Sequence, residues 1–333
     1  MSKWYNESGN QGDIVLSSRI RLARNIAEYP FPNRLSPQQM KEVNAKIKEA
    51  ADNSDIKFMY LDMAELPKVQ AISLAERHLI SPEFAENTEN RALLITEDED
   101  VSIMLCEEDH IRLQVMGSGL CLDEIYKTAN KLDNNFASVL EFAFDERLGY
   151  LTQCPTNLGT AMRASVMLHL PALTSCSQIS RLANSISKLG LTIRGVFGEG
   201  SSPMGDIYQI SNQVSLGISE QTAIKNLTSI TMQIIEQERS AAAEMLKNPT
   251  VQDKVFRAYG VLKNARLLST QEFMSLISIV RYGTVNKLLD IDLTKISELI
   301  VNMQAATISV LNSGELSPEE RDFIRAKTVR ESI

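Results

Sequence analysis

The sequence predicts an α+β fold: an antiparallel sheet flanked by helices, followed by an all-helical C-terminal domain. Three observations support this prediction. Alternating segments joined by short polar turns mark the first half, which is typical of antiparallel strands. From Ser219 onward, apolar residues recur only at helical spacing. Helix-start patterns occur at Ser36 and Ser317. We therefore expect an α+β domain over residues 1–248 and a helical domain over residues 249–333.

The first elements follow from alternation and capping. Residues 13–24 read as a strand that prolines terminate. Ser36, followed by proline and then by Gln39, predicts a capped helix over residues 36–51. A short strand is expected over residues 56–61.

The clearest β region spans residues 91–115. Two apolar runs flank an acidic turn, and a third run alternates apolar side chains with polar ones that include Arg112. The next expected elements are a helix over 123–143, an irregular stretch over 149–160, a helix over 172–189, and strands over 191–194 and 206–211. Further helices are expected over 219–248, 251–265, 270–289, 294–312 and 318–331.

The bulk composition argues against several classes of protein. The 333 residues carry a net charge of −8, which does not suit general nucleic-acid binding. No apolar run reaches roughly 18 residues, so we expect no membrane span, and the N-terminus lacks a secretory layout. Four cysteines without a C-x-x-C pair and only three histidines argue against a zinc site. We expect free thiols in a cytoplasmic protein.

Arginines at defined positions stand out in this acidic chain. Arg19 and Arg21 lie two positions apart in a predicted strand, so both leave one face at roughly 7 Å spacing, which suits adjacent phosphates. Arg194 precedes a glycine-rich segment that can bring backbone N–H groups to an anion. A solvated strand edge and an ordinary loop are the alternatives that the pattern leaves open.

Carboxylates form a second group. Glu107, Glu108 and Asp109 precede a predicted strand, where a cleft can form, and Glu199 lies in the glycine-rich segment. An ordinary acidic turn is the alternative.

Together and in this order, four segments resemble the signature sequences of the phosphagen, or guanidino, kinases. They are VLSSRIRLARN (15–25), CEEDHIRLQVM (106–116), CPTNLGTAMRAS (154–165) and RGVFGEGSSPMGDIYQISN (194–212). Within that superfamily the chain resembles the bacterial McsB-type protein arginine kinases, which have this form of the glycine-rich segment. RDFIRA (321–326) is also similar to the element that forms a phosphoarginine pocket in those kinases.

The position of the first signature segment adds to this resemblance. SSRIR begins near the start of the chain, so the N-terminal helical domain that closes over small substrates in the superfamily is expected to be missing. A site without that clamp would accept an arginine side chain projecting from another protein.

The resemblance implies a role for each matched residue. Glu108 would be the base, Glu199 would hold a second nitrogen of the guanidinium, and Glu107 would anchor Mg²⁺ through water. Cys154 would lie near the reacting group; a small buried hydrophobe is the nearly equal alternative explanation of this cysteine. The ATP-binding residues would be Arg19, Arg21, Arg112, Arg163 and Arg194, together with Ser17 and His78.

The last predicted helix carries a third candidate site. Arg321 and Arg325 lie at positions i and i+4, so both can face one anion, and Asp322 can accept a guanidinium. With the resemblance, this pattern predicts a phosphoarginine-binding site that is allosteric. A solvated charged face is the alternative.

The resemblance therefore implies an ATP- and Mg²⁺-dependent kinase that phosphorylates arginine side chains of proteins and marks those proteins for a Clp protease. The alternatives are a small-molecule kinase acting on free arginine and a non-catalytic phosphoarginine-binding adaptor. The implied partners are protein substrates with exposed arginine, a zinc-finger activator, a heat-shock repressor, a Clp ATPase and a second copy of the chain. No membrane or direct nucleic-acid partner is expected.

Overall fold

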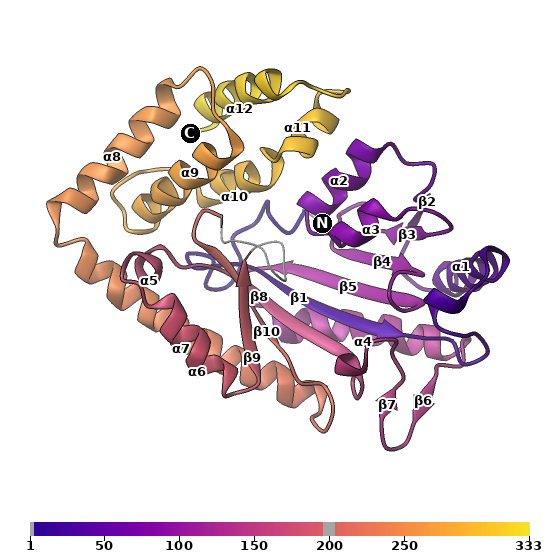
Figure 1. Ribbon diagram of the computed structural model, residues 1–333. Helices are drawn as coiled ribbons and strands as arrows, with labels where there is room; N and C mark the ends of the chain where they lie inside the picture. The colour runs from indigo at the N-terminus through magenta and orange to yellow at the C-terminus, as the bar shows by residue number, and fades with distance from the viewer. Residues whose placement is uncertain (1–2, 196–203) are drawn as a thin grey trace.

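The computed structural model describes residues 3–195 and 204–333. Its main feature is an eight-stranded sheet with the order β2-β3-β4-β5-β1-β8-β10-β9 (Figure 1). Every neighbouring pair is antiparallel, which confirms the predicted arrangement. The strands are β1 (Val15–Arg24), β2 (Met59–Asp62), β3 (Ala92–Ile95), β4 (Val101–Leu105), β5 (Ile111–Ser118), β8 (Met162–His169), β9 (Leu191–Gly195) and β10 (Ile207–Asn212). A separate hairpin joins β6 (Phe144–Asp145) to β7 (Gly149–Tyr150).

Strand β1 lies in the middle of the sheet, between β5 and β8. Its side chains alternate, because successive residues of a strand point to opposite faces. Ile20 and Leu22 are buried, whereas Arg19 and Arg21 are partly exposed on the other face. The sheet therefore has one apolar face and one face that carries charges.

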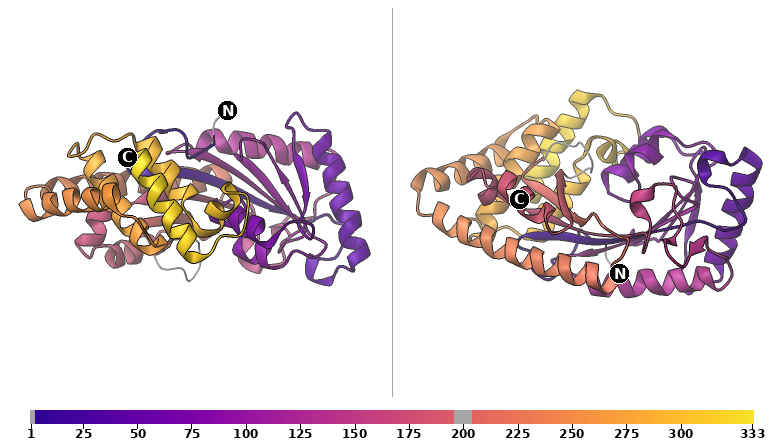
Figure 2. Two further views of the ribbon diagram at one scale, coloured as in Figure 1. Left: turned by 90° about the horizontal axis from the view of Figure 1, so that it is seen from above. Right: turned by 60° about the horizontal axis from the view of Figure 1, so that its bottom comes forward.

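Two long helices cover the apolar face. They are α4 (Leu122–Ala137) and α7 (Glu220–Met245), which run along the sheet beneath the strands in the right view of Figure 2. Their buried residues share one hydrophobic core with β1, β5 and β8. This core also takes in α1 (Pro37–Asp52), which begins with the predicted capping box of Ser36 and Gln39, and α6 (Ile179–Ser187).

Two short helices lie on the opposite side of the sheet, beside β3 and β4. They are α2 (Lys68–Glu76) and α3 (Pro82–Glu86), and they bury Leu74 and Phe84 against Leu93 and Met104. The segment that contains α2 and α3 borders the charged face of the sheet.

The C-terminal region is helical, as predicted. It consists of α8 (Pro249–Asn264), α9 (Thr270–Val285), α10 (Leu293–Asn302), α11 (Ala305–Leu311) and α12 (Pro318–Ser332). Its core includes Leu16, Met167 and Ile207 of the sheet, so the helices and the sheet pack as one body. The predicted capping box at Ser317 is present. No helix in residues 3–195 or 204–333 is long and apolar enough to cross a membrane.

Several elements differ from the prediction. The central strand β8 and helices α2 and α3 were not predicted, and α4 ends at Ala137, six residues before the expected end at 143. The helix expected over 172–189 is divided into α5 (Pro171–Ser175) and α6, because Ser177 between them has φ 56°. The helix expected over 294–312 is likewise divided into α10 and α11, because the backbone of Gln304 between them has an extended conformation.

Candidate active site

A cavity of about 540 Å³ opens on the charged face of the sheet. All five arginines predicted to bind ATP line it, and they come from β5, β1, β8 and β9. Positions as far apart as 19 and 194 therefore meet at one place. The predicted site residues in the cavity wall are Arg19, Arg21, His78, Glu107, Glu108, Arg112, Cys154, Arg163 and Arg194.

The strand register brings like charges together. Arg21 on β1 is directly opposite Arg163 on β8, and Arg112 on β5 is opposite Ala23, two residues further along β1. Like charges opposite each other across antiparallel strands are destabilising. The arrangement therefore costs folding free energy that a bound anion would offset.

Arg19 is held by neutral side chains. Its Nη2 donates to Gln209 Oε1 at 2.8 Å, and its Nε and Nη1 lie 3.4 Å from Ser165 Oγ and Gln114 Oε1. Burial, followed by the charges of Arg112 and Arg163, lowers the pKa of Arg19 to about 10. The same causes hold the pKa of Arg21 well below its usual value. Such a cluster favours a polyanionic ligand.

Glu107 is fixed at the edge of the arginine cluster. It pairs with Arg112, accepts from Ser81 Oγ at 2.8 Å and accepts from the Glu108 amide at 2.9 Å. Burial raises its pKa, but the Arg112 charge and these hydrogen bonds outweigh burial and bring the pKa down to about 2. Glu107 is therefore ionised at neutral pH, and both of its oxygens are engaged.

Glu108 is the carboxylate in the cavity wall whose pKa moves upward. Burial is the main cause, and the neighbouring acids Asp109 and Glu107 add to it against the opposing effect of Arg112. A carboxylate with a raised pKa is a better proton acceptor than an ordinary one.

The sequence analysis missed several contacts that support the site. Asp109 accepts from Asn25 Nδ2 at 2.6 Å and from the Gln153 amide at 2.9 Å, which fixes the loop behind Glu108. Asn25 Oδ1 accepts from the His110 amide, and His110 Nδ1 accepts from the Ile26 amide. Asn25 stands in the first signature segment, and Asp109 and His110 stand in the second; these positions were the available signal.

His78 and Ser17 were both predicted to bind ATP, and they lie in different surroundings. His78 lines the cavity; burial, followed by the Arg19 charge, lowers its pKa to about 3, so the ring is neutral. Ser17 is buried in β1 and is not among the residues that line the cavity.

Cys154 lines the cavity and directly precedes a short 3-10 helix, Pro155–Asn157. Its thiol is partly exposed, and its Sγ lies 3.0 Å from Thr156 Oγ1. Glu199, predicted to hold the second nitrogen of the acceptor, falls in residues 196–203 and thus lies outside the described residues.

Comparison with known proteins decides the family. The family model described as ATP:guanido phosphotransferase, C-terminal catalytic domain, matches residues 39–241. That range includes Glu107, Glu108, Arg112, Arg163 and Arg194. The chain belongs to the ATP:guanido phosphotransferase family.

Full-length relatives of this guanido phosphotransferase are named protein-arginine kinase. One from Caldanaerobacter subterraneus subsp. tengcongensis is 46% identical over 323 residues, covering 95% of this chain and 96% of the relative. One from Halothermothrix orenii is 44% identical over 334 residues, covering 99% and 96%. A second family model, the protein-arginine kinase McsB C-terminal domain, matches residues 248–333.

Solved guanidino kinase structures confirm the fold. A duplicated taurocyamine kinase from Schistosoma mansoni, with bound transition state analog components, has a TM-score of 0.61 at 29% identity. The match covers 68% of this chain, which spans about a third (33%) of that protein. Lombricine kinase has a TM-score of 0.62 at 25% identity, and this match covers 71% of this chain and 69% of the lombricine kinase chain.

The family implies a magnesium ion, and Glu107 suits an indirect role toward it. Among residues 3–195 and 204–333, no group of three or more His, Cys, Asp or Glu side chains is placed to hold a metal. Glu107 already accepts from Arg112, Ser81 and the Glu108 amide. A carboxylate engaged in this way fits an ion held mainly by phosphate oxygens and water.

The C-terminal residues of the guanido phosphotransferase do not form one exposed anion site. Arg325 is fully buried and donates to the carbonyls of Met303 and Leu268, to Thr270 Oγ1 and to Asp322 Oδ1. Arg321 instead lines a separate cavity of about 320 Å³. The phosphoarginine-binding role of Arg321, Asp322 and Arg325 stays a prediction.

Proposed function

We propose that this guanido phosphotransferase is an ATP-dependent protein arginine kinase, which transfers the γ-phosphoryl group to arginine side chains of other proteins. One observation carries the proposal: five arginines from four strands line one cavity together with Glu108. The relatives that match over nearly the whole chain, and the second family model, support a protein as the acceptor.

In this proposal the arginines hold the triphosphate and stabilise the charge that develops during transfer. The transferred group passes through a loose transition state, so catalysis depends on positioning and on preorganised positive charge. Arg21, Arg163 and Arg112 are held close together by the sheet, so little reorganisation is needed when the phosphates arrive.

Glu108 acts on the acceptor guanidinium. A guanidinium is protonated at neutral pH, and the attacking nitrogen must lose a proton as its bond to phosphorus forms. Glu108 orients the N–H and takes that proton while the bond from the γ-phosphorus to the β,γ-bridging oxygen breaks. Glu199 is proposed to hold a second guanidinium nitrogen, which would fix the direction of attack.

Magnesium would supply charge neutralisation on the phosphate oxygens. Glu107 would hold its water shell, and Arg112 would keep the Glu107 carboxylate in place. Cys154 is proposed to lie beside the acceptor guanidinium.

A small guanidino compound is the second candidate acceptor. The names of the taurocyamine and lombricine kinases favour it, because both refer to small guanidino compounds. The cavity alone is compatible with either class of acceptor.

The test compares the two acceptors directly. Purified protein is incubated with Mg-ATP and an arginine-rich protein, or with free arginine at equal guanidinium concentration. Phosphorylated peptides are then mapped by mass spectrometry without acid, because the N–P bond is acid-labile. Phosphoarginine on the protein, and little product from free arginine, is the expected result. Product from free arginine alone would overturn the proposal.

Several further properties remain proposals that follow from the resemblance. They are marking of substrates for a Clp protease, action with a zinc-finger activator and a heat-shock repressor, homodimerisation and a cytoplasmic location.

A further inference from the structure

The carboxylate of Glu76 connects helix α2, which lies beside the arginine-lined cavity, to the C-terminal helices. Glu76 is the last residue of α2, and it accepts from the amides of Ala306 and Thr307 at 2.9 and 2.7 Å. It also accepts from Thr307 Oγ1 at 2.8 Å, and Ser73 Oγ lies 3.1 Å from the same hydroxyl. These four residues, Ser73 and Glu76 of α2 and Ala306 and Thr307 of α11, connect the first turn of α11 to the end of α2.

Helix α11 takes its N-terminal cap from Glu76. Gln304 occupies the capping position, but its side chain makes no capping hydrogen bond. The first amides of a helix need an acceptor, and a carboxylate there also interacts favourably with the helix dipole. Because Glu76 belongs to another element, the cap ties the position of α11 to the position of α2.

The residues directly after Glu76 form part of the nucleotide cavity. His78, Ile80 and Ser81 all line it. The His78 carbonyl accepts from Gln114 Nε2 at 2.7 Å, and Gln114 is also in contact with Arg19. Ser81 donates to Glu107. His78 has φ 64°, a conformation that a residue with a side chain adopts only when its surroundings impose it.

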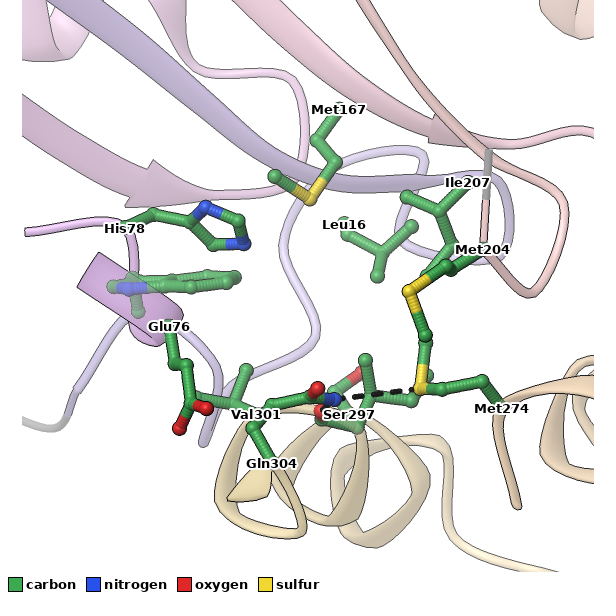
Figure 3. Close-up of a pocket in the computed structure, with 12 residues that line it drawn as sticks. Leu16, Glu76, His78, Met167, Met204, Ile207, Met274, Ser297, Val301 and Gln304 are labelled. Atoms are coloured by element: carbon green, nitrogen blue, oxygen red, sulfur yellow. Dashed lines mark hydrogen bonds between the residues drawn. The ribbon is translucent and has the colours of Figure 1, made fainter. Parts of the chain in front are cut away.

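A second contact runs beside the first. The Trp4 ring lies 6.3 Å from the His78 ring, and Trp4 shares a small apolar cluster with Val301 of α10. Figure 3 shows Glu76 and His78 on one side of a narrow cavity, with Val301 and Gln304 facing them from the C-terminal helices. This cavity is small, at about 20 Å³, so the side chains around it pack closely.

We propose that Glu76 is a positioning residue: by capping α11 it sets the position of residues 76–81, and thereby the affinity of the cavity for ATP. Glu76 also lines the cavity that contains Arg321, and its neighbour Ala75 lines the nucleotide cavity. The inference rests on the proposed binding of ATP at the arginine cluster.

The substitution Glu76→Gln tests the proposal with little change in shape. The glutamine retains one acceptor oxygen and turns an NH₂ group toward the second amide of α11. We expect the dissociation constant and the KM for ATP to rise roughly three- to tenfold, within the usual range for coupled sites. The kcat at saturating ATP should stay within about twofold, because no group that contacts the reacting atoms is altered.

The matched control is Glu65→Gln, which changes an exposed glutamate near the start of α2. Direct titration of the intact protein with Mg-ATP, without acceptor, gives the dissociation constants of all variants. Wild-type affinity in Glu76→Gln would overturn the inference and leave the proposed kinase intact. Absence of ATP binding by the wild type would overturn both.

A milder pair of variants covers the case in which Glu76→Gln folds poorly. Thr307→Val removes one donor to Glu76 from the C-terminal side, and Thr307→Ser retains the hydroxyl. We expect a smaller rise in the KM for ATP in Thr307→Val and near wild-type values in Thr307→Ser. An equal KM for ATP in Thr307→Val and Thr307→Ser would contradict the proposal. A threonine with a purely structural role would alter the amount of folded protein, but it would leave the KM for ATP unchanged.

Discussion

Arg21 on β1 and Arg163 on β8 stand directly opposite each other in the sheet, so two guanidinium groups leave the same face at neighbouring positions. Without a ligand, the repulsion between these two opposed charges destabilises the sheet. The opposed arginines lower the stability of the sheet and at the same time preorganise a site for an anion. Both effects can be measured on one variant.

Arg163→Gln should be more stable than the wild type and nearly inactive. Removing one of two opposed charges relieves repulsion of roughly 0.5 kcal/mol, whereas turnover should fall by about 10²-fold or more. Urea unfolding without nucleotide and an ATP turnover assay measure the two effects. Arg266→Gln, at an exposed position of the helical region, should change neither.

Glu108→Gln should remove the proton acceptor while preserving the cavity. We expect kcat to fall by at least ~10²-fold, the usual scale for a general base, with little change in the affinity for ATP. Initial rates and nucleotide titrations of the variant test this. Near-normal turnover would show that another group takes the proton. Glu86→Gln on the adjacent helix α3 serves as the control, because its side chain is exposed.

The titration of Glu238 should lower the free energy of unfolding as the pH rises. The side chain is buried and accepts from the amides of Ala172 and Leu173. Burial raises its pKa from 4.5 to about 7 against the opposing effect of these bonds. Between those pH values the folded chain keeps a proton that the unfolded chain has lost, so the free energy of unfolding declines with pH.

The variant Glu238→Gln removes this titration. Relative to it, the wild type should lose on the order of 3 kcal/mol of unfolding free energy between pH 4.5 and about 7. Urea unfolding at a series of pH values measures the difference. A constant difference across that range would contradict the expectation. Glu236→Gln on the same helix is the exposed control.

Arg321 and Arg325 should respond differently to truncation. Arg325→Ala leaves buried carbonyl groups without a donor, so it should lower the unfolding free energy by about 3 kcal/mol or more. Arg321→Ala should leave stability nearly unchanged and weaken the binding of a phosphoarginine peptide. Calorimetric titration with that peptide measures the second effect. Unchanged binding by Arg321→Ala would remove this residue from the predicted site.

The arginine positions on β1 could be predicted because strand alternation is a local property. Arg19 and Arg21 share a face whatever the rest of the chain does. The opposition of Arg21 and Arg163 could not be predicted from the residues alone, because it depends on β8. Residues 162–169 are nearly all buried and show no alternation, which hides this central strand from pattern analysis.

The polar residues that hold the site are absent from the prediction for a similar reason. Ser81, Gln114 and Gln209 are ordinary residues in sequence and acquire their roles through contacts made at long range. The same holds for Glu76, whose acceptor role depends on a helix 230 residues later in the chain. Arg325 reads as a surface cation by helical spacing, but its burial is decided by the carbonyls of neighbouring loops.

The central place of β1 has a consequence for biosynthesis. Among the strands of this sheet, β1 is translated before the others, yet one of its two neighbours, β8, is made roughly 140 residues later, from Met162 onward. Until then its arginines and its apolar side chains have no complete partner surface, and nascent chains of this kind are prone to aggregate. The arginine cluster of this chain therefore cannot assemble until β8 and β9 have been translated.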